Sequence, residues 1–208
     1  MTILEERATH SAAAEEASAA RTARRAMIDS QLRVSGVNDP AVLAAFAQVA
    51  REDFVPEGLK ANAYIDRALP LGEGRMLAAP LVQGRMLTEA APTAADEVLV
   101  VSANGYLAAL VSALGCRLER LAPAEAAAAK KKAGTASLLL IDGAIEQLPA
   151  GLAARVAEGG RVVTGLVERG VTRLAAGTKV AGDIALLPLA EMGMPVLGEF
   201  AAPRRWSF

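Results

Sequence analysis

The sequence predicts an α/β fold built on a mostly parallel β-sheet and preceded by a helical extension. From residue 97 onward, short apolar segments alternate with helical stretches, which is typical of βαβ units packed over a parallel sheet. Residues 4–34 contain neither Pro nor Gly and are rich in Ala, Glu and Arg, which predicts one long helix. Since 208 residues suit a single domain, we expect a helical extension over residues 1–26 and one domain over residues 27–208.

Helix boundaries are marked clearly in the first half of the chain. Gly36 is expected to end the long helix, and Asn38-Asp39-Pro40 supplies an N-cap and a first-turn proline for a helix over residues 41–49. Pro80 is expected to begin a further helix, and residues 51–80 are read as short elements and turns.

The second half carries the expected sheet. The expected parallel strands are Val98–Val101, Arg117–Leu121, Ser137–Ile141 and Arg161–Leu166. The helices between them are expected at Tyr106–Leu114, Pro123–Lys132 and Pro149–Ala157, and the antiparallel ending at Val171–Ala176 and Lys179–Leu187. Because Val98–Val101 has the most continuous apolar run before a turn, we expect it to be the central strand.

Composition excludes several classes of protein. The chain has 22 Lys and Arg against 23 Asp and Glu, so net charge gives no basis for a nucleic-acid or acidic-membrane partner. A small molecule or a protein is the expected partner. Cys116 is the only cysteine and His10 the only histidine, which excludes an internal disulfide, a clustered-thiolate zinc site and triads based on histidine. No metal site is predicted.

The sequence shows no targeting or membrane segment. Glu5, Glu6 and Arg7 stand where a signal peptide would have its basic and apolar regions. The uncharged run from Val98 to Cys116 is interrupted in its middle by polar and glycine residues, so a strand, a turn and a buried helix explain it better than a membrane span. A reducing, cytoplasmic location is the expectation.

The turn after the first strand is the first candidate site. In a doubly wound sheet the ligand binds beyond the carboxyl ends of the strands, and here that turn reads Ser102-Ala103-Asn104-Gly105. Gly105, and Asn104 to a lesser degree, tolerate the left-handed backbone that such loops use. One glycine is a weak signal, and taken alone the loop is explained better by an ordinary strand-to-helix turn. The absence of G-x-G-x-x-G argues against a nicotinamide dehydrogenase.

Two acidic residues are candidates at the same edge of the sheet. Glu119 falls near the end of the second strand, where a carboxylate can accept hydrogen bonds from both ribose hydroxyls. The alternative is a solvated surface glutamate. Asp142-Gly143 follows the strand Ser137–Ile141, and the alternative there is a common Asp-Gly turn.

Taken together, these residues resemble the protein-L-isoaspartate O-methyltransferase family. Several short motifs occur in the order found in that family, and the resemblance runs from about Met27 to the end of the chain. These motifs are Gln31-Leu32-Arg33, Arg51-Glu52-Asp53-Phe54-Val55-Pro56, Ala63-Tyr64-Ile65-Asp66, Ala68-Leu69-Pro70-Leu71-Gly72, Gly105-Tyr106 with Ala108-Ala109, Asp142 through Pro149, and Gly159-Gly160-Arg161-Val162-Val163.

The resemblance implies a Rossmann-like class I methyltransferase fold and S-adenosylmethionine as cofactor. It also implies methylation of the abnormal carboxylate of isoaspartyl residues in damaged proteins, a protein-repair reaction on a protein or peptide substrate. It places the cofactor at Ser102, Ala103, Asn104, Gly105, Glu119 and Asp142, and the substrate at Leu77, Ala79 and Pro80. No catalytic residue is assigned.

The sequence departs from the family pattern at three places. Val100 stands at the position of the family's loop acid, and the loop has fewer glycines and one residue less. Leu77-Ala78-Ala79-Pro80 replaces Ile-Ser-Gln-Pro. Residues 130–135 are too few for the family's third strand, so the sheet is expected to be one strand short.

Two hypotheses of different class follow. The chain is either a divergent S-adenosylmethionine-dependent methyltransferase or a catalytically inactive relative that keeps the fold as a binding or structural module. The loop favours the second and predicts weak or absent cofactor binding. The N-terminal helix is either a dimerisation arm that makes a homo-oligomer or a solvated extension.

Overall fold

The computed structural model describes the backbone of residues 3–203 and the side-chain surroundings of residues 15–203. Its α-helices are α1 (Ile3–Met27), α2 (Pro40–Gln48), α3 (Pro80–Ala90), α4 (Tyr106–Ala113), α5 (Pro123–Ala127) and α6 (Ala150–Ala154). Its strands are β1 (Leu69–Gly72), β2 (Arg75–Leu77), β3 (Glu97–Val101), β4 (Arg117–Leu121), β5 (Ala136–Ile145), β6 (Val156–Glu168), β7 (Val171–Val180), β8 (Asp183–Ile184) and β9 (Leu187–Glu191). Short 3-10 helices cover Arg51–Phe54, Glu57–Asn62 and Gly198–Phe200.

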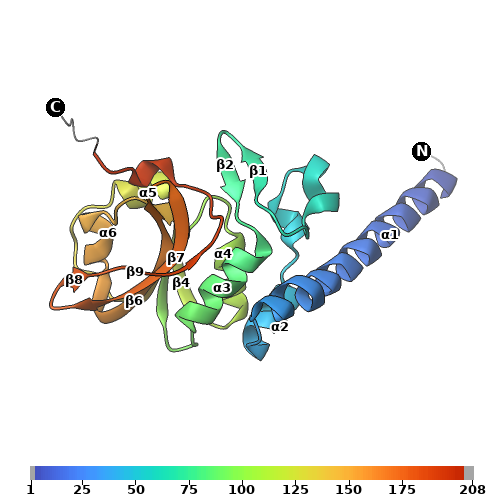
Figure 1. The fold of residues 1–208 in the computed structure, drawn as a ribbon. Coiled ribbons are helices and arrows are strands. Elements are labelled where there is room, and N and C mark those ends of the chain that lie inside the picture. Colours follow the sequence, from blue (N-terminus) through green and yellow to red (C-terminus); the bar gives the residue numbers. More distant parts are fainter. Residues whose placement is uncertain (1–2, 204–208) are drawn as a thin grey trace.

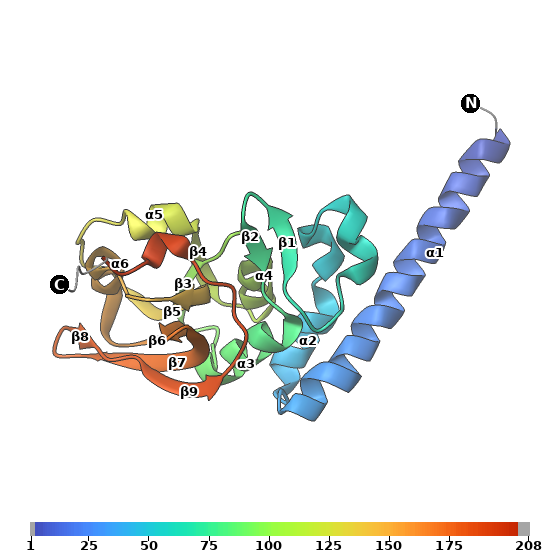
Figure 2. The same ribbon diagram turned by 45° about the horizontal axis from the view of Figure 1, so that its top comes forward.

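Helix α1 extends away from the rest of the molecule, as both ribbon views show (Figures 1 and 2). The helical backbone continues beyond Met27 through a π-helical turn at Ile28–Leu32 and a 3-10 turn at Arg33–Ser35. Gly36 then adopts a left-handed φ of 86° and ends it, as expected. No break marks residue 26, so the separate extension over residues 1–26 stays a prediction.

Asp39 caps helix α2, as the sequence predicted. Its carboxylate accepts hydrogen bonds from the backbone N–H groups of Ala41 and Val42, both at 2.9 Å, and Pro40 occupies the first turn. These bonds satisfy two donors that the helix itself cannot pair.

We therefore expect Asp39→Ala to lower the free energy of unfolding by about 1 kcal/mol, because two N–H groups lose their acceptor. Asp39→Ser keeps an acceptor oxygen and is expected to lose much less. Urea unfolding of both variants measures the difference, and an equal loss in both would contradict a capping role.

The main sheet confirms the mostly parallel α/β fold. Its strand order is β4-β3-β5-β6-β7-β8, with β9 also paired to β7. Strands β4, β3, β5 and β6 are mutually parallel, whereas β7, β8 and β9 join in antiparallel fashion. Strand β3 has neighbours on both sides, but it is second from the edge and not at the centre.

The expectation of a sheet one strand short is wrong as a count. The described sheet has seven strands, because the C-terminal part contributes three antiparallel strands, one of them the two-residue β8. At the other side, residues 130–135 form no strand, and β4 is therefore an edge strand.

Several boundaries also differ from the sequence prediction. Helix α5 ends at Ala127 and not at Lys132, because the lysine run that follows has few apolar side chains to bury. The helix expected to reach Ala157 ends at Ala154, and β6 begins at Val156. Strand β5 continues through Asp142-Gly143 with an irregular register between Leu140 and Ala144.

The sheet is packed on both faces, and this packing positions the site. Val98, Val100, Leu138 and Leu140 belong to the core cluster shared with α2, α3 and α4. The alternate residues Leu99, Val101, Leu139 and Ile141 belong to the cluster shared with α5 and α6. Because side chains alternate along a strand, the next residues, Ser102 and Asp142, return to the first face.

The described part of the chain contains no helix long and apolar enough to cross a bilayer. Among the same residues, no three His, Cys, Asp or Glu side chains gather where a metal ion could bind.

Candidate functional site

Ser102 and Asp142 lie next to each other at the carboxyl edge of the sheet. The last pair in the parallel register of β3 and β5 is Val101 with Ile141, so these two residues follow on neighbouring strands. Both are buried, with exposed fractions of 0% and 6%. Ser102 Oγ and one carboxylate oxygen of Asp142, Oδ1, have no hydrogen-bond partner in the described structure. The sheet therefore brings two of the predicted cofactor residues together, but both side chains are buried.

A chain of buried hydrogen bonds runs from Asp142 to Arg51. Gln83, in the first turns of α3, donates from Nε2 to Asp142 Oδ2 at 2.9 Å. Arg51 donates from Nη1 to Gln83 Oε1 at 2.8 Å. Arg51 and Gln83 are both 0% exposed, so a neutral amide separates a buried cation from a buried carboxyl group.

Arg51 also holds the predicted substrate-side segment. Its guanidinium donates to the carbonyl of Ala78 at 2.5 Å and to that of Ala63 at 2.8 Å. It lies over the ring of Tyr106, 4.9 Å from the ring centre. Ala78 stands between Leu77 and Ala79, so the segment before Pro80 is tied to Asp142 through Arg51 and Gln83.

Arg51, Gln83 and Tyr106 were given no site role from the sequence. Arg51 and Tyr106 belong to motifs of the family resemblance, but nothing in their spacing indicates that the guanidinium is buried. Gln83 occupies an ordinary helical position. The partners are 32 and 59 residues apart in sequence, so no local pattern could have revealed the chain.

Burial perturbs the ionisable groups of this cluster. Loss of hydration raises the pKa of Asp142 to about 6, although the Gln83 hydrogen bond and the Arg51 charge act in the opposite direction. Burial likewise lowers the pKa of the Arg51 guanidinium, opposed by its interactions with Tyr106 and Asp142. Burial also raises the pKa of Tyr106.

The predicted cofactor loop is a short turn that Asn104 and Gly105 shape. Asn104 Oδ1 accepts from the backbone N–H of Tyr106 at 3.1 Å, and its Nδ2 donates to the carbonyl of Phe54 at 3.2 Å. Gly105 has a φ of 87°, a conformation that favours glycine, and α4 begins at the next residue. Ala103 and Asn104 line an open groove of about 600 Å³ together with residues 53–56, 71–73 and 75.

Arg120 lies against this loop from β4. Its Nη1 donates to the carbonyl of Ser102 at 3.2 Å. A Cβ atom placed on Gly105 would meet the Arg120 Cδ at 3.7 Å. An arginine side chain therefore contacts the backbone that a close-lying ligand would need to approach.

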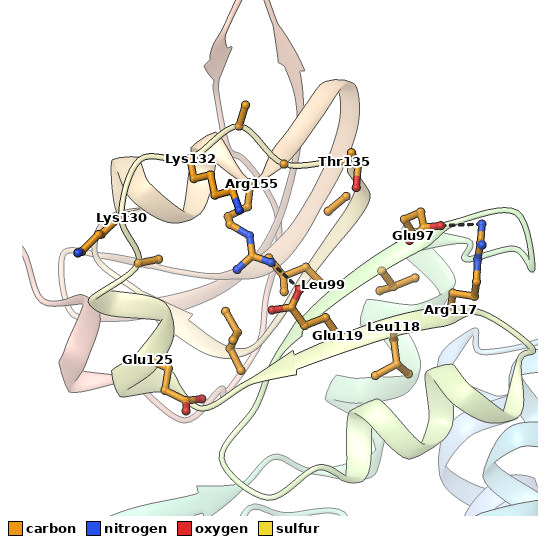
Figure 3. Close-up of a pocket in the computed structure, with 16 residues that line it drawn as sticks. Glu97, Leu99, Arg117, Leu118, Glu119, Glu125, Lys130, Lys132, Thr135 and Arg155 are labelled. Atoms are coloured by element: carbon orange, nitrogen blue, oxygen red, sulfur yellow. Dashed lines mark hydrogen bonds and ion pairs between the residues drawn. The ribbon is translucent and has the colours of Figure 1, made fainter.

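Glu119 lies on the other face of the sheet. It pairs in register with Leu99, two residues before β4 ends, and its carboxylate forms an ion pair with Arg155 at 2.5 Å. Figure 3 shows these two side chains meeting in a groove of about 600 Å³. The structure does not bring Glu119 together with Ser102 or Asp142, and its ribose role stays a prediction.

The predicted cofactor residues do not all lie on one face of the sheet. Ser102 and Asp142 are buried, Glu119 faces the opposite side, and Arg120 lies beside Gly105. The structure therefore assigns no reaction step to these residues.

Two sequence comparisons indicate the same family. The family model described as protein-L-isoaspartate (D-aspartate) O-methyltransferase matches residues 22–120. A protein-L-isoaspartate O-methyltransferase of Methylorubrum populi is 33% identical over 165 residues, which are 68% of this chain and 78% of the relative. The chain belongs to the protein-L-isoaspartate O-methyltransferase family. A relative of the same description from Methanoculleus marisnigri is 29% identical over 89% of this chain and 96% of its own length.

A solved structure supports the fold. A protein-L-isoaspartate O-methyltransferase from Plasmodium falciparum, solved in complex with S-adenosyl-L-homocysteine, superposes with a TM-score of 0.70. It is 18% identical, and the match covers 85% of this chain and 98% of that one. The class I methyltransferase fold expected from the sequence is confirmed.

Two residues that the sequence predicts to depart from the family pattern are buried. Val100, at the position of the family's loop acid, is fully buried in the core. Ala78, at the position of the family's serine, is buried and presents its carbonyl to Arg51. That polar groups of the family have been replaced on the cofactor and substrate sides stays a prediction.

Proposed function

We propose that this member of the protein-L-isoaspartate O-methyltransferase family keeps the fold but has lost tight S-adenosylmethionine binding, and that it acts as a protein- or peptide-binding module. The observation that carries the proposal is the loop at Ser102–Gly105, whose serine is buried and whose glycine lies against Arg120.

The expected loss of affinity is large. A loop with one glycine keeps its backbone farther from a ligand, and each polar group of the ligand left without a partner costs roughly 1–3 kcal/mol. Two or three such losses weaken binding at least roughly a hundredfold.

The second candidate function is S-adenosylmethionine-dependent methylation of isoaspartyl carboxylates in damaged proteins. Family membership favours it, as does the Plasmodium falciparum relative with its bound S-adenosyl-L-homocysteine. The presence of a single histidine, His10, does not oppose it, because the acceptor carboxylate is already ionised at neutral pH.

Location and assembly are part of the proposal. Cys116, buried and free, fits a reducing compartment such as the cytoplasm. Helix α1, which extends away from the sheet, is a surface through which two copies could pair. Sedimentation over a range of protein concentrations tests the pairing.

The binding experiment separates the two functions. A ligand at about a hundred times its Kd stabilises the folded state by about 2.7 kcal/mol, which raises the Tm of a domain of this size by several degrees. At micromolar S-adenosylmethionine or S-adenosyl-L-homocysteine we expect no shift, and no methylation of an isoaspartyl peptide above background. A rise in Tm of several degrees that Glu119→Ala abolishes would contradict the loss of cofactor binding and support the methyltransferase function instead.

A variant that is expected to gain affinity for the cofactor tests the same loop. Arg120→Ala removes the side chain beside Gly105 without touching the core. If Arg120 obstructs the loop, this variant binds S-adenosyl-L-homocysteine more tightly than the natural chain does.

A further inference from the structure

The outer edge of strand β4 is free. Strand β4 ends the strand order of the sheet, and its only partner in the described structure is β3. The backbone N–H of Ser102 donates to the carbonyl of Leu121, so Leu121 directs its backbone groups toward β3. Because these groups alternate in direction along a strand, those of Leu118 and Arg120 point outward. An added strand would find two donors and two acceptors there.

A groove of about 600 Å³ lies over β3 and β4, on the face that Glu119 occupies. Figure 3 shows the two sides of the groove. Strand β4, with Arg117, Leu118 and Glu119, forms one side, and the segment with Lys130, Lys132 and Thr135 forms the other. Leu99 and Leu121 supply apolar lining. Residues 130–135 form a loop and no strand, and most of them line the groove opposite β4.

The residues that line the groove include more cations than carboxylates. Glu97 pairs with Arg117 at 2.6 Å, and Glu119 pairs with Arg155 at 2.5 Å. Glu125 accepts the backbone N–H of Ala122 at 2.8 Å. Lys130 and Lys132 have no ion pair or hydrogen bond among the described residues. Four cationic residues and three carboxylates line the groove. Figure 3 shows Lys132 directed toward Arg155 and Lys130 directed away from β4.

We propose that the free edge of β4 binds an extended, acidic peptide segment of a partner protein, which adds to the sheet as a further strand. Main-chain hydrogen bonds to Leu118 and Arg120 would hold the segment, and side-chain alternation would select its sequence. Acidic side chains would lie on the groove face near Lys130 and Lys132, and apolar ones on the opposite face near the half-buried Leu118.

This site lies away from Ser102–Gly105, so the inference goes beyond the proposed function and holds whether or not the cofactor binds. The short, charged strand β4 is also protected against unspecific edge pairing. A partner therefore needs the complementary charge pattern.

A labelled peptide in which Glu and Val alternate is the probe, and its Lys-Val counterpart is the control. By fluorescence anisotropy with the full chain, we expect saturable binding of the Glu-Val peptide only, weakened by salt. The double variant Lys130→Glu, Lys132→Glu is expected to weaken binding about tenfold or more, since two attractive charges become repulsive. Lys60→Glu, which changes a lysine elsewhere on the surface, is expected to leave binding unchanged.

The strand geometry has its own test. Leu118→Pro removes an outward N–H without removing a bond to β3 and is expected to abolish binding. If that variant does not fold, a Glu-Val peptide with methylated backbone nitrogens serves instead, because it keeps the charges but cannot donate to β4. Equal binding of the Glu-Val and Lys-Val peptides, undiminished binding of the methylated peptide, or no saturable binding overturns the proposal. So does a dimer of the natural chain that Leu118→Pro dissociates, because a second copy would then occupy the edge.

Discussion

Replacing Arg51 by methionine is expected to lower the free energy of unfolding by about 3–5 kcal/mol. The guanidinium is fully buried and donates to the carbonyls of Ala63 and Ala78 and to Gln83. Methionine fills a similar volume but has no donor, so three buried acceptors lose their hydrogen bonds and the Asp142 carboxyl group loses its nearby cation.

The matched control is Arg33→Met. Arg33 forms an exposed ion pair with Asp29, and its side chain is 54% exposed, so its loss is expected to change stability by less than about 0.5 kcal/mol. Urea unfolding of both variants at neutral pH measures the comparison. Similar losses in the two variants would show that the buried network contributes no more than a surface pair.

The second large effect is expected from Asp142→Asn and depends on pH. The pKa of this carboxyl group is about 6 in the folded chain, against about 4 for an unfolded aspartate. Below about pH 4 the group is neutral in both states and costs nothing. Above about pH 6 it is ionised in both, and the folded state carries a cost on the order of 3 kcal/mol.

Stability contributed by this group therefore falls as the pH rises from about 4 to about 6. Asparagine is neutral throughout, and its carbonyl can still accept from Gln83. We expect the variant and the natural chain to be equally stable near pH 4, and the variant to be more stable by about 1–3 kcal/mol near pH 8. Denaturant unfolding of both proteins across this pH range measures the difference between their free energies of unfolding. The other carboxyl groups are the same in both proteins, so their contributions cancel in this difference. A difference that does not change with pH would contradict the buried ionisation.

Much of the fold could be predicted because it depends on local patterns. Val98–Val101 and the first turns of α3 follow from an apolar run and a first-turn proline, and both are found where expected. Segments that depend on their surroundings were misplaced. Ala124–Lys132 has high helix propensity throughout, yet α5 stops at Ala127 because the lysines cannot be buried. Strand β8 has two residues, too few to leave a pattern.

The site was predictable only as positions along the chain. Strand register explains why Ser102 and Asp142 meet, but burial and side-chain direction come from tertiary packing, which a single sequence does not display. Glu119 illustrates the limit, since a shift of one residue along a strand moves a side chain to the other face. Arg51 and Gln83 were missed because buried polar groups are recognised by their partners, and those partners are distant in sequence.

Helix α1 also fixes the distance between its first residues and the rest of the molecule. An α-helix of 25 residues is about 37 Å long, comparable to the width of a small domain. Unlike a flexible linker, it holds its two ends at a nearly fixed separation. A fluorophore or affinity tag attached at the start of α1 would therefore be held well away from the sheet. This geometry suits distance measurements between the start of α1 and the sheet.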